Sequence, residues 1–329
     1  MGRMSRNDAP SPNPPACTFG LDPLLLGTGC CTVAALGYTA ANICVQTLQA
    51  RNPLIWVLFV KESVAVLLVG PWLLWRAGRG EGVWPGRRTL LALAAVGLLT
   101  HLAGNLPLFW AMSVVGLAIA IPANLGVALI ASAALGWFFL RERVSLQSAV
   151  AIAAMIASVI LLSHGAGEAN GSSGAGAAVA WGAFFIALAV VLACVAGVVF
   201  GTLNLAIRHS ATRGVSLGLL AMWIPAMGTA ALGPMCLWRY GVSGLLATPL
   251  SDFLLMLLCG LLNLIAYLAI IKGLQMTTMV HANVVMASEA AMAAVAGLLF
   301  FQEASSPALV AGVCLTVAGM VLMDRPVPA

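Results

Sequence analysis

A single glutamate in the middle of a long apolar stretch is the residue best placed to do chemistry. Glu289 lies near the centre of the apolar segment 277–301. A charged side chain at the centre of a membrane helix costs about 2.5–3.5 kcal/mol, so it should face the protein interior or water. There it could bind a proton, a cation or the ammonium group of a substrate. The structural alternative is a carboxyl group that is neutral or paired and only locks helix packing.

Polar side chains four residues apart recur in other apolar segments, and such residues share one face of a helix. The sequence contains three pairs of this kind: Tyr38 and Asn42, His101 and Asn105, and Asn263 and Tyr267. Pro107 lacks a backbone N–H and therefore leaves the carbonyl of Ala103 free beside the second pair. We expect the pairs to line one central cavity, with Asn124 and Asn204 as weaker candidates. The alternative is that they only join neighbouring helices, through hydrogen bonds of about 0.6 kcal/mol each.

Three further titratable residues lie in apolar segments. Lys61 and Glu62 are neighbours in the segment 53–75, and because neighbours are about 100° apart on a helix, they cannot be assumed to pair. Lys61 either faces the cavity or extends its amino group to the outer membrane interface, and both interpretations stay open. His281 lies near the inner end of the segment 277–301. A hydrated interfacial position is therefore favoured for it over a place in the cavity.

The composition of the chain indicates that these residues lie on membrane-spanning helices. Hydrophobic residues make up 62% of the chain and charged residues only 8%, against about 25% charged residues in soluble domains. Mean hydropathy is +1.04. Segments of about 20 apolar residues can cross a bilayer as helices, and ten are found: 24–48, 53–75, 89–112, 117–140, 146–163, 179–207, 216–238, 253–271, 277–301 and 307–323. We predict an all-α membrane protein of ten transmembrane helices surrounded by the lipid bilayer.

Loop charge predicts the orientation of these helices. With the N-terminus inside, the inner loops and tails hold 12 of the 15 Lys and Arg residues, the outer loops hold Arg51 and Arg239, and Lys61 lies within a span. Basic residues favour the cytoplasmic side, so both termini are expected in the cytoplasm. The net charge of +5 is then a sign of topology, and no nucleic-acid partner is expected.

The chain also repeats one pattern. A shift of 161 positions superposes Gly136 on Gly297 and Glu142 on Glu303. Five predicted spans lie on each side of a Gly- and Ser-rich segment, and an odd number makes the second copy cross the membrane in the opposite direction. We predict two inverted five-helix repeats, divided as follows: a disordered cytoplasmic tail at 1–20, a first repeat at 21–164, an outer linker at 165–178, a second repeat at 179–324 and a tail at 325–329.

Gly197 and Gly201 form a GxxxG pattern, which allows two helices to approach closely. We expect this pattern to act inside the bundle, with a homodimer contact as the alternative use.

Three segments resemble the EamA type of the drug/metabolite transporter superfamily. The segment 288–303 carries two glutamates, Glu289 and Glu303, fourteen residues apart. The segment 273–279 is similar to that family's approach to the ninth helix, and 111–117 is similar to its counterpart in the first half. The resemblance covers most of the chain. It implies movement of a solute, often export of amino acids or other small metabolites, through a central cavity, and it does not indicate the substrate.

The sequence departs from the family pattern at three places. The proline that follows the mid-helix glutamate in the family is Ala290 here, and Lys61 stands where an arginine is usual. In the first half, Ala128 occupies the position that Glu289 holds in the second.

Other function classes fit the sequence less well. The predicted spans contain no aspartate, and the HExxH motif is absent, so an enzyme is not expected and no catalytic residues are assigned. The eight cysteines show no CxxC spacing, so neither a metal site nor a disulfide framework is expected, and no cofactor is indicated. Lys61 is the single basic residue within the spans, which is too few for phosphorylated solutes.

We therefore predict a carrier that moves a small neutral or zwitterionic, amino-acid-like solute by alternating access, as a proton-linked exporter. An uncoupled facilitator or channel is the alternative, followed by a membrane-embedded enzyme. The Ala- and Gly-rich composition favours a bacterial inner membrane.

Overall fold

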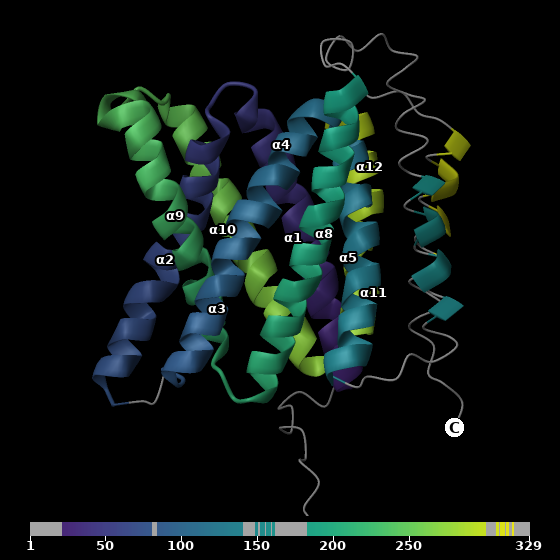
Figure 1. Ribbon diagram of the computed structural model, residues 1–329, viewed down its shortest axis with the longest axis horizontal. Helices are drawn as coiled ribbons and strands as arrows, with labels where there is room; N and C mark the ends of the chain where they lie inside the picture. Colours follow the sequence, from purple (N-terminus) through teal and green to yellow (C-terminus); the bar gives the residue numbers. More distant parts are fainter. Residues whose placement is uncertain are drawn as a thin grey trace, which may run out of the picture.

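A computed structural model of the chain describes residues 22–80, 84–140 and 183–300, with scattered residues between 149 and 161 and between 307 and 318. Every regular element in these residues is helical, and the helices stand side by side in one bundle (Figure 1). In chain order they are α1 (Pro23–Gln49), α2 (Leu54–Gly78), α3 (Arg87–Leu99), η1 (Thr100–Asn105), α4 (Leu106–Val115), α5 (Leu117–Leu140), α8 (Ala183–Thr212), α9 (Leu217–Leu246), α10 (Leu250–Met276), α11 (Met279–Met286) and α12 (Ser288–Phe300).

Eight of the ten predicted spans are helices long and apolar enough to cross a bilayer. Helices α3, η1 and α4 together form the third span, and α11 and α12 form the ninth. The predicted spans 146–163 and 307–323 are described only in part. Where they are described they meet, since the hydroxyl of Ser158 donates to the carbonyl of Gly312 at 3.0 Å.

The predicted tails at 1–20 and 325–329 and the predicted linker at 165–178 also lie outside the described residues. The number of ten helices, the limits of the repeats and the cytoplasmic position of both termini therefore stay predictions.

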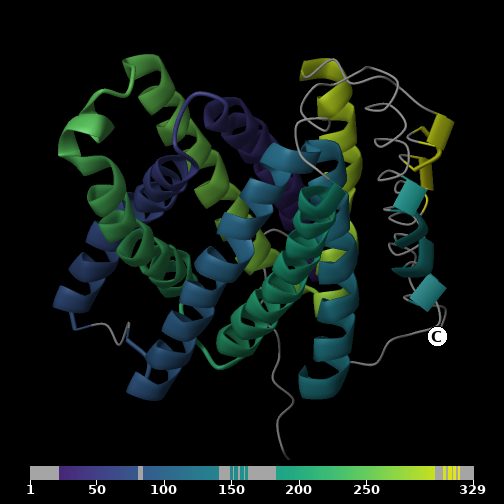
Figure 2. The ribbon, with the colours of Figure 1, turned by 45° about the horizontal axis from the view of Figure 1, so that its top comes forward.

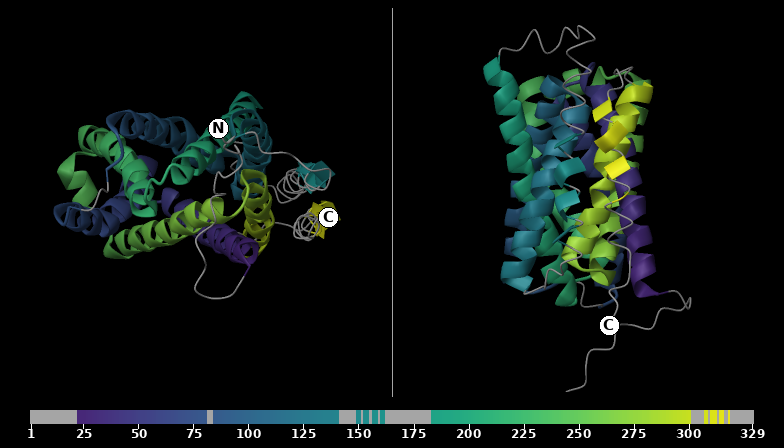
Figure 3. Two further views of the ribbon diagram at one scale, coloured as in Figure 1. Left: turned by 90° about the horizontal axis from the view of Figure 1, so that it is seen from below. Right: turned by 90° about the vertical axis from the view of Figure 1, so that its right-hand side faces the viewer.

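The two halves of the chain pack against each other and do not form separate lobes. Helix α1 lies along α10, α2 along α9 and α5 along α8, as the views in Figure 2 and Figure 3 show. Two buried apolar clusters result. One contains Leu48 and Met256, near the end of the bundle with the turn at residues 50–53, and the other contains Leu73 and Leu219, near the opposite end. The middle of the bundle lies between the clusters.

The GxxxG pattern acts within this bundle. A Cβ atom added at Gly197 would overlap the backbone carbonyl of Asn124, and one added at Gly201 would lie 2.9 Å from Cβ of Ala131. Only glycine lets the backbones of α8 and α5 approach this closely. The prediction of close packing inside the bundle is confirmed, and this contact positions Asn124 in the middle of the fold.

The third span is interrupted by a wider turn. Residues Thr100–Asn105 form the π-helical turn η1, in which the N–H of Leu106 donates to the carbonyl of His101, five residues earlier. Pro107 follows directly and has no N–H for the carbonyl of Ala103, which breaks the α-helical hydrogen-bond pattern at this point. Single π-helical turns are frequent at functional sites.

The ninth span has one irregular residue, Ala287, between α11 and α12. Helix α11 ends at Met286 and α12 begins at Ser288. The Ser288 hydroxyl donates to the carbonyl of Val285 at 2.7 Å, and such side-chain bonds compete with regular helix geometry. Ala287 itself has right-handed helical φ and ψ, so Met279–Ala296 still forms one candidate span.

Candidate functional site

A cavity of about 150 Å³ lies in the middle of the bundle, and cavities of about this size in other proteins hold a molecule such as benzene. Its polar wall consists of Tyr38, Asn42, Lys61, Glu62, Thr100, His101, Asn105, Asn124, Asn204, Asn263, Tyr267, Asn283 and Glu289. Nine of the ten residues predicted as site residues are among them, and the exception is His281. The structure brings the nine together, and their role in binding stays a prediction.

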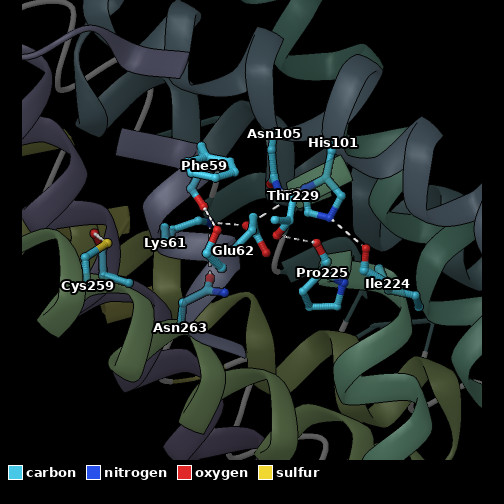
Figure 4. A network of polar contacts seen from close by, with 12 residues as sticks. Phe59, Lys61, Glu62, His101, Asn105, Ile224, Pro225, Thr229, Cys259 and Asn263 are labelled. Carbon is cyan, nitrogen blue, oxygen red and sulfur yellow. Dashed lines mark hydrogen bonds and ion pairs between the residues drawn. The ribbon is translucent and has the colours of Figure 1, made fainter. Parts of the chain in front are cut away.

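Lys61 and Glu62 form an ion pair inside the bundle (Figure 4). Lys61 Nζ lies 3.0 Å from Glu62 Oε1, donates to Asn263 Oδ1 at 3.3 Å and lies 5.0 Å from the centre of the Phe109 ring. Lys61 and Glu62 are 3% and 2% exposed. Of the two interpretations of Lys61, the cavity-facing one is therefore correct, because the amino group turns inward and not to the end of the helix.

His101 is held by two hydrogen bonds that define its protonated nitrogen. Nε2 lies 3.2 Å from the carbonyl oxygen of Ile224, which can only accept, so Nε2 carries the proton. In the neutral ring Nδ1 is then the acceptor for the Asn105 amide at 3.0 Å. The same Nδ1 lies 3.9 Å from Glu62 Oε1. Gly228 leaves room for the ring, since a Cβ there would lie 2.6 Å from it.

Glu289 lies on the other side of the cavity and has a different environment. It is 5% exposed and accepts a hydrogen bond from the Asn42 amide at 2.8 Å. Within the described part of the chain it makes no ion pair. Tyr38 lies on α1 one turn before Asn42 and lines the same cavity.

Two polar atoms of the cavity wall have no hydrogen-bond partner among the described residues. They are Asn124 Oδ1 and Tyr267 Oη, both buried. Asn204 differs, because its amide donates to Asn283 Oδ1 at 2.8 Å, and Asn283 in turn donates to the carbonyl of Met279 at 2.7 Å.

Asn283 and Thr100 are lining residues that the sequence analysis missed. For Thr100 no spacing signal was available, because it lies inside the π-helical turn. Asn283 had a signal, since it is an amide in an apolar span close to Glu289. That signal does not tell whether the amide faces the cavity or a neighbouring helix.

The expectation of a hydrated, interfacial His281 was wrong. This residue is 5% exposed, and its Nε2 lies 2.8 Å from the hydroxyl of Thr28 on α1. The Thr28 hydroxyl donates to the carbonyl of Leu24, so His281 is the donor in this contact. Helix α11 begins beside α1, with Thr278 as its N-cap, and this packing buries the imidazole away from the cavity.

The remaining wall of the cavity is apolar. It includes Leu108, Phe109, Ile121, Leu125, Phe200, Leu203, Ile224, Ile270 and Met286. A cavity wall with both charged and apolar parts suits a small solute that carries polar groups and an apolar side chain. In the described part of the chain, no group of three or more His, Cys, Asp and Glu residues is arranged to hold a metal ion.

Known proteins agree with this architecture. The model of the EamA-like transporter family matches the chain twice, over residues 25–164 and 187–324. A solved structure described only as the crystal structure of a protein has the same fold, with a TM-score of 0.65 and 18% identity over 91% of this chain and 96% of that one. No curated protein sequence matches the chain. The two family matches cover most of the sequence, and the chain is therefore a multi-pass membrane protein that belongs to the EamA-like transporter family.

Proposed function

We propose that the protein is an alternating-access carrier for a small neutral or zwitterionic, amino-acid-like solute. The observation that carries this proposal is the central cavity, which Lys61, Glu62 and Glu289 share with an apolar wall. Lys61 is the one cation among the described lining residues, and it is already paired with Glu62 at 3.0 Å. Phosphorylated solutes need several free cations. A solute with both charges, or with none, suits the cavity better.

Contacts between the two halves at both ends of the bundle support alternating access. At the end with the turn at residues 50–53, Asn52 donates to Asp252 at 2.8 Å. At the opposite end, Thr28 and His281 are joined at 2.8 Å. Alternating access requires one end to open while the other stays closed. The neutral contact between Thr28 and His281 contributes only about 1 kcal/mol net, and the bond to the carboxylate of Asp252 about 1.5–3 kcal/mol, which is small enough to break in a transport cycle.

Glu289 is the proposed site of proton coupling. It is the carboxyl group of the cavity that makes no ion pair within the described residues, and its one hydrogen bond comes from the neutral amide of Asn42. A proton bound there in exchange for the substrate would couple export to the proton gradient. We also propose a bacterial inner membrane as the location, in keeping with the Ala- and Gly-rich spans.

Counterflow in proteoliposomes tests the carrier function. Vesicles preloaded with unlabelled leucine should take up labelled leucine transiently above equilibrium, with a rate that saturates with concentration, and protein-free vesicles should not. A pH gradient should drive accumulation of leucine, whereas an uncoupled facilitator would only equilibrate it. Uptake that rises linearly with concentration and shows no counterflow would contradict a carrier and favour a channel.

A further inference from the structure

The two unpartnered atoms of the cavity wall indicate where a ligand binds. Asn124 and Tyr267 are 5% and 6% exposed, and Asn124 Oδ1 and Tyr267 Oη have no hydrogen-bond partner among the described residues. A buried polar atom without a partner is unfavourable, so such atoms are normally satisfied by water or a ligand. Because both residues line the cavity, the molecule that satisfies these two atoms is the one that occupies it.

Asn124 belongs to the side of the cavity that carries Glu289. It lies on α5, which packs along α12, and Ala128, one turn later on α5, lines the same cavity. Glu289 accepts one hydrogen bond, from Asn42, and makes no ion pair in the described part of the chain. An ionised carboxylate and an amide oxygen only accept hydrogen bonds. This side therefore offers negative charge and free acceptors.

Tyr267 belongs to the side that carries the cation. It follows Asn263 by one turn on α10, and Asn263 accepts a hydrogen bond from Lys61 at 3.3 Å. A lysine has three N–H donors, of which Glu62 and Asn263 take two. This side therefore offers the Tyr267 hydroxyl as a donor without a partner among the described residues, beside the Lys61 ammonium group that balances the charge of Glu62.

Building on the proposed function, we infer that the substrate binds in one orientation, with its protonated amino group toward Glu289 and Asn124 and its carboxylate toward Tyr267. The acceptors then face the cation and the donors face the anion. Because the oxygen of Asn124 needs a donor, the cationic end of the substrate must carry N–H groups. Asn124 and Tyr267 determine specificity at the two ends, and a fully methylated amine is discriminated against.

Three probes test this orientation with the purified full-length protein. Leucine carries both charged groups, 3-methylbutylamine lacks the carboxylate, and N,N,N-trimethylleucine lacks N–H donors on its cation. A ligand raises the Tm of the protein according to its affinity, so titrations of thermal unfolding yield a Kd for each probe. Wild-type protein is expected to bind leucine and the amine, and to bind trimethylleucine roughly tenfold more weakly than leucine.

Two variants separate the two ends of the substrate. Tyr267→Phe removes only a hydroxyl that has no partner among the described residues, so the Tm of the free protein should not fall. It should weaken leucine binding roughly tenfold and leave the amine unchanged. Asn124→Leu should weaken leucine and the amine alike and reduce the discrimination against trimethylleucine.

Ser132→Ala is the matched control for both variants. Ser132 lies on α5 and also has a buried oxygen without a partner in the described residues, but it does not line the cavity. It should change none of the three affinities. A change in probe preference in this control would show that loss of any unpaired buried group alters binding, and would overturn the inference.

The orientation is wrong if Tyr267→Phe weakens leucine and the amine equally, or if trimethylleucine binds as tightly as leucine. It is also wrong if the wild-type protein binds neither leucine nor the amine. Counterflow of leucine is measured separately. If the three probes bind as expected but leucine shows no counterflow, the carrier function is contradicted and the orientation stands. If leucine shows counterflow but the probes do not bind as expected, the orientation is contradicted and the carrier function stands.

Discussion

Glu62 and Glu289 line the same cavity, one from each half of the chain, yet their partners differ. Glu62 lies 3.0 Å from the ammonium group of Lys61 and 3.9 Å from His101 Nδ1. Glu289 accepts a single hydrogen bond from the neutral amide of Asn42. The two sites therefore contain the same chemical group in two electrostatic settings. Glu62 is paired with a lysine of the protein, and Glu289 has no ion pair among the described residues.

The difference separates a structural charge from a functional one. Burying an ion is costly unless a charge of opposite sign accompanies it. The protein supplies that charge to Glu62 through Lys61, so this pair is neutral as a unit and fixes the position of Asn263. At Glu289 the compensating charge has to come from a proton or a ligand. We expect loss of one member of the Lys61–Glu62 pair to affect folding most and loss of the Glu289 carboxylate to affect transport most.

Removing the cation from the paired side should have the largest effect. Lys61→Met leaves Glu62 buried without a counter-charge and should lower the free energy of unfolding by about 3–5 kcal/mol. Adding Glu62→Gln should recover most of that loss, because no charge is then left unpaired. Chemical denaturation in detergent measures both variants. A double variant as unstable as Lys61→Met alone would show that the pair is not held as a neutral unit.

Neutralising the unpaired side should reduce transport and spare the fold. Glu289→Gln keeps an oxygen that can accept from Asn42, so the fold should persist, whereas coupled export into inverted vesicles should fall about a hundredfold, or about 2.7 kcal/mol. The dependence of transport on pH should flatten. Asp22→Asn is the control, because Asp22 is an exposed N-cap of α1 and asparagine also caps helices. Normal transport with unchanged pH dependence in Glu289→Gln would exclude proton coupling at this residue.

The single partner of Glu289 allows a sharper test of the comparison. At a pH high enough to ionise Glu289, Asn42→Ala removes the hydrogen bond to its carboxylate and should cost about 1.5 kcal/mol of stability, as expected for a bond to a charged acceptor. In the Glu289→Gln background the same change should cost less, because the acceptor is then neutral. Thermal unfolding of the four proteins gives the coupling energy between the two positions. Costs that simply add would mean that the two side chains do not depend on each other.

The smallest effect is expected away from both sides. His281→Leu removes one hydrogen bond to Thr28 at the end of the bundle and should cost about 1 kcal/mol of stability. Its relative affinities for leucine and 3-methylbutylamine should equal those of the wild type, because His281 does not line the cavity. A changed preference would place this residue in contact with the substrate.

Spacing alone predicted much of the cavity. Residues four apart on an apolar helix share a face, and for that reason His101 and Asn105 meet each other in the structure. The position of Glu289 in the middle of a span was likewise enough to predict an inward-facing carboxyl group, because lipid does not tolerate the charge. Such predictions succeed when the direction in which a side chain points depends only on its own helix and on the surrounding lipid.

The remaining features depend on contacts between helices or on irregular backbone. Lys61 pairs with its neighbour Glu62 because its flexible side chain turns toward the interior, which the angle between adjacent residues does not reveal. Asn283 was missed because a single amide in an apolar span does not reveal whether it faces the cavity or a neighbouring helix, and here it does both, since it also accepts a hydrogen bond from Asn204 on α8. The burial of His281 follows from the packing of α11 on α1. This packing cannot be predicted from the residues close to His281 in the sequence.

The close contact at Gly197 and Gly201 bears on how such a carrier changes shape. It joins α5 of the first half to α8 of the second, with backbone against backbone. Helices packed this closely do not slide freely past each other. The two helices should therefore move as one rigid body. The parts of the protein that move together are then not the two sequence repeats, because α5 belongs to the first repeat and α8 to the second. A disulfide engineered across this contact should leave leucine counterflow intact, and its loss on cross-linking would show that the two helices move apart.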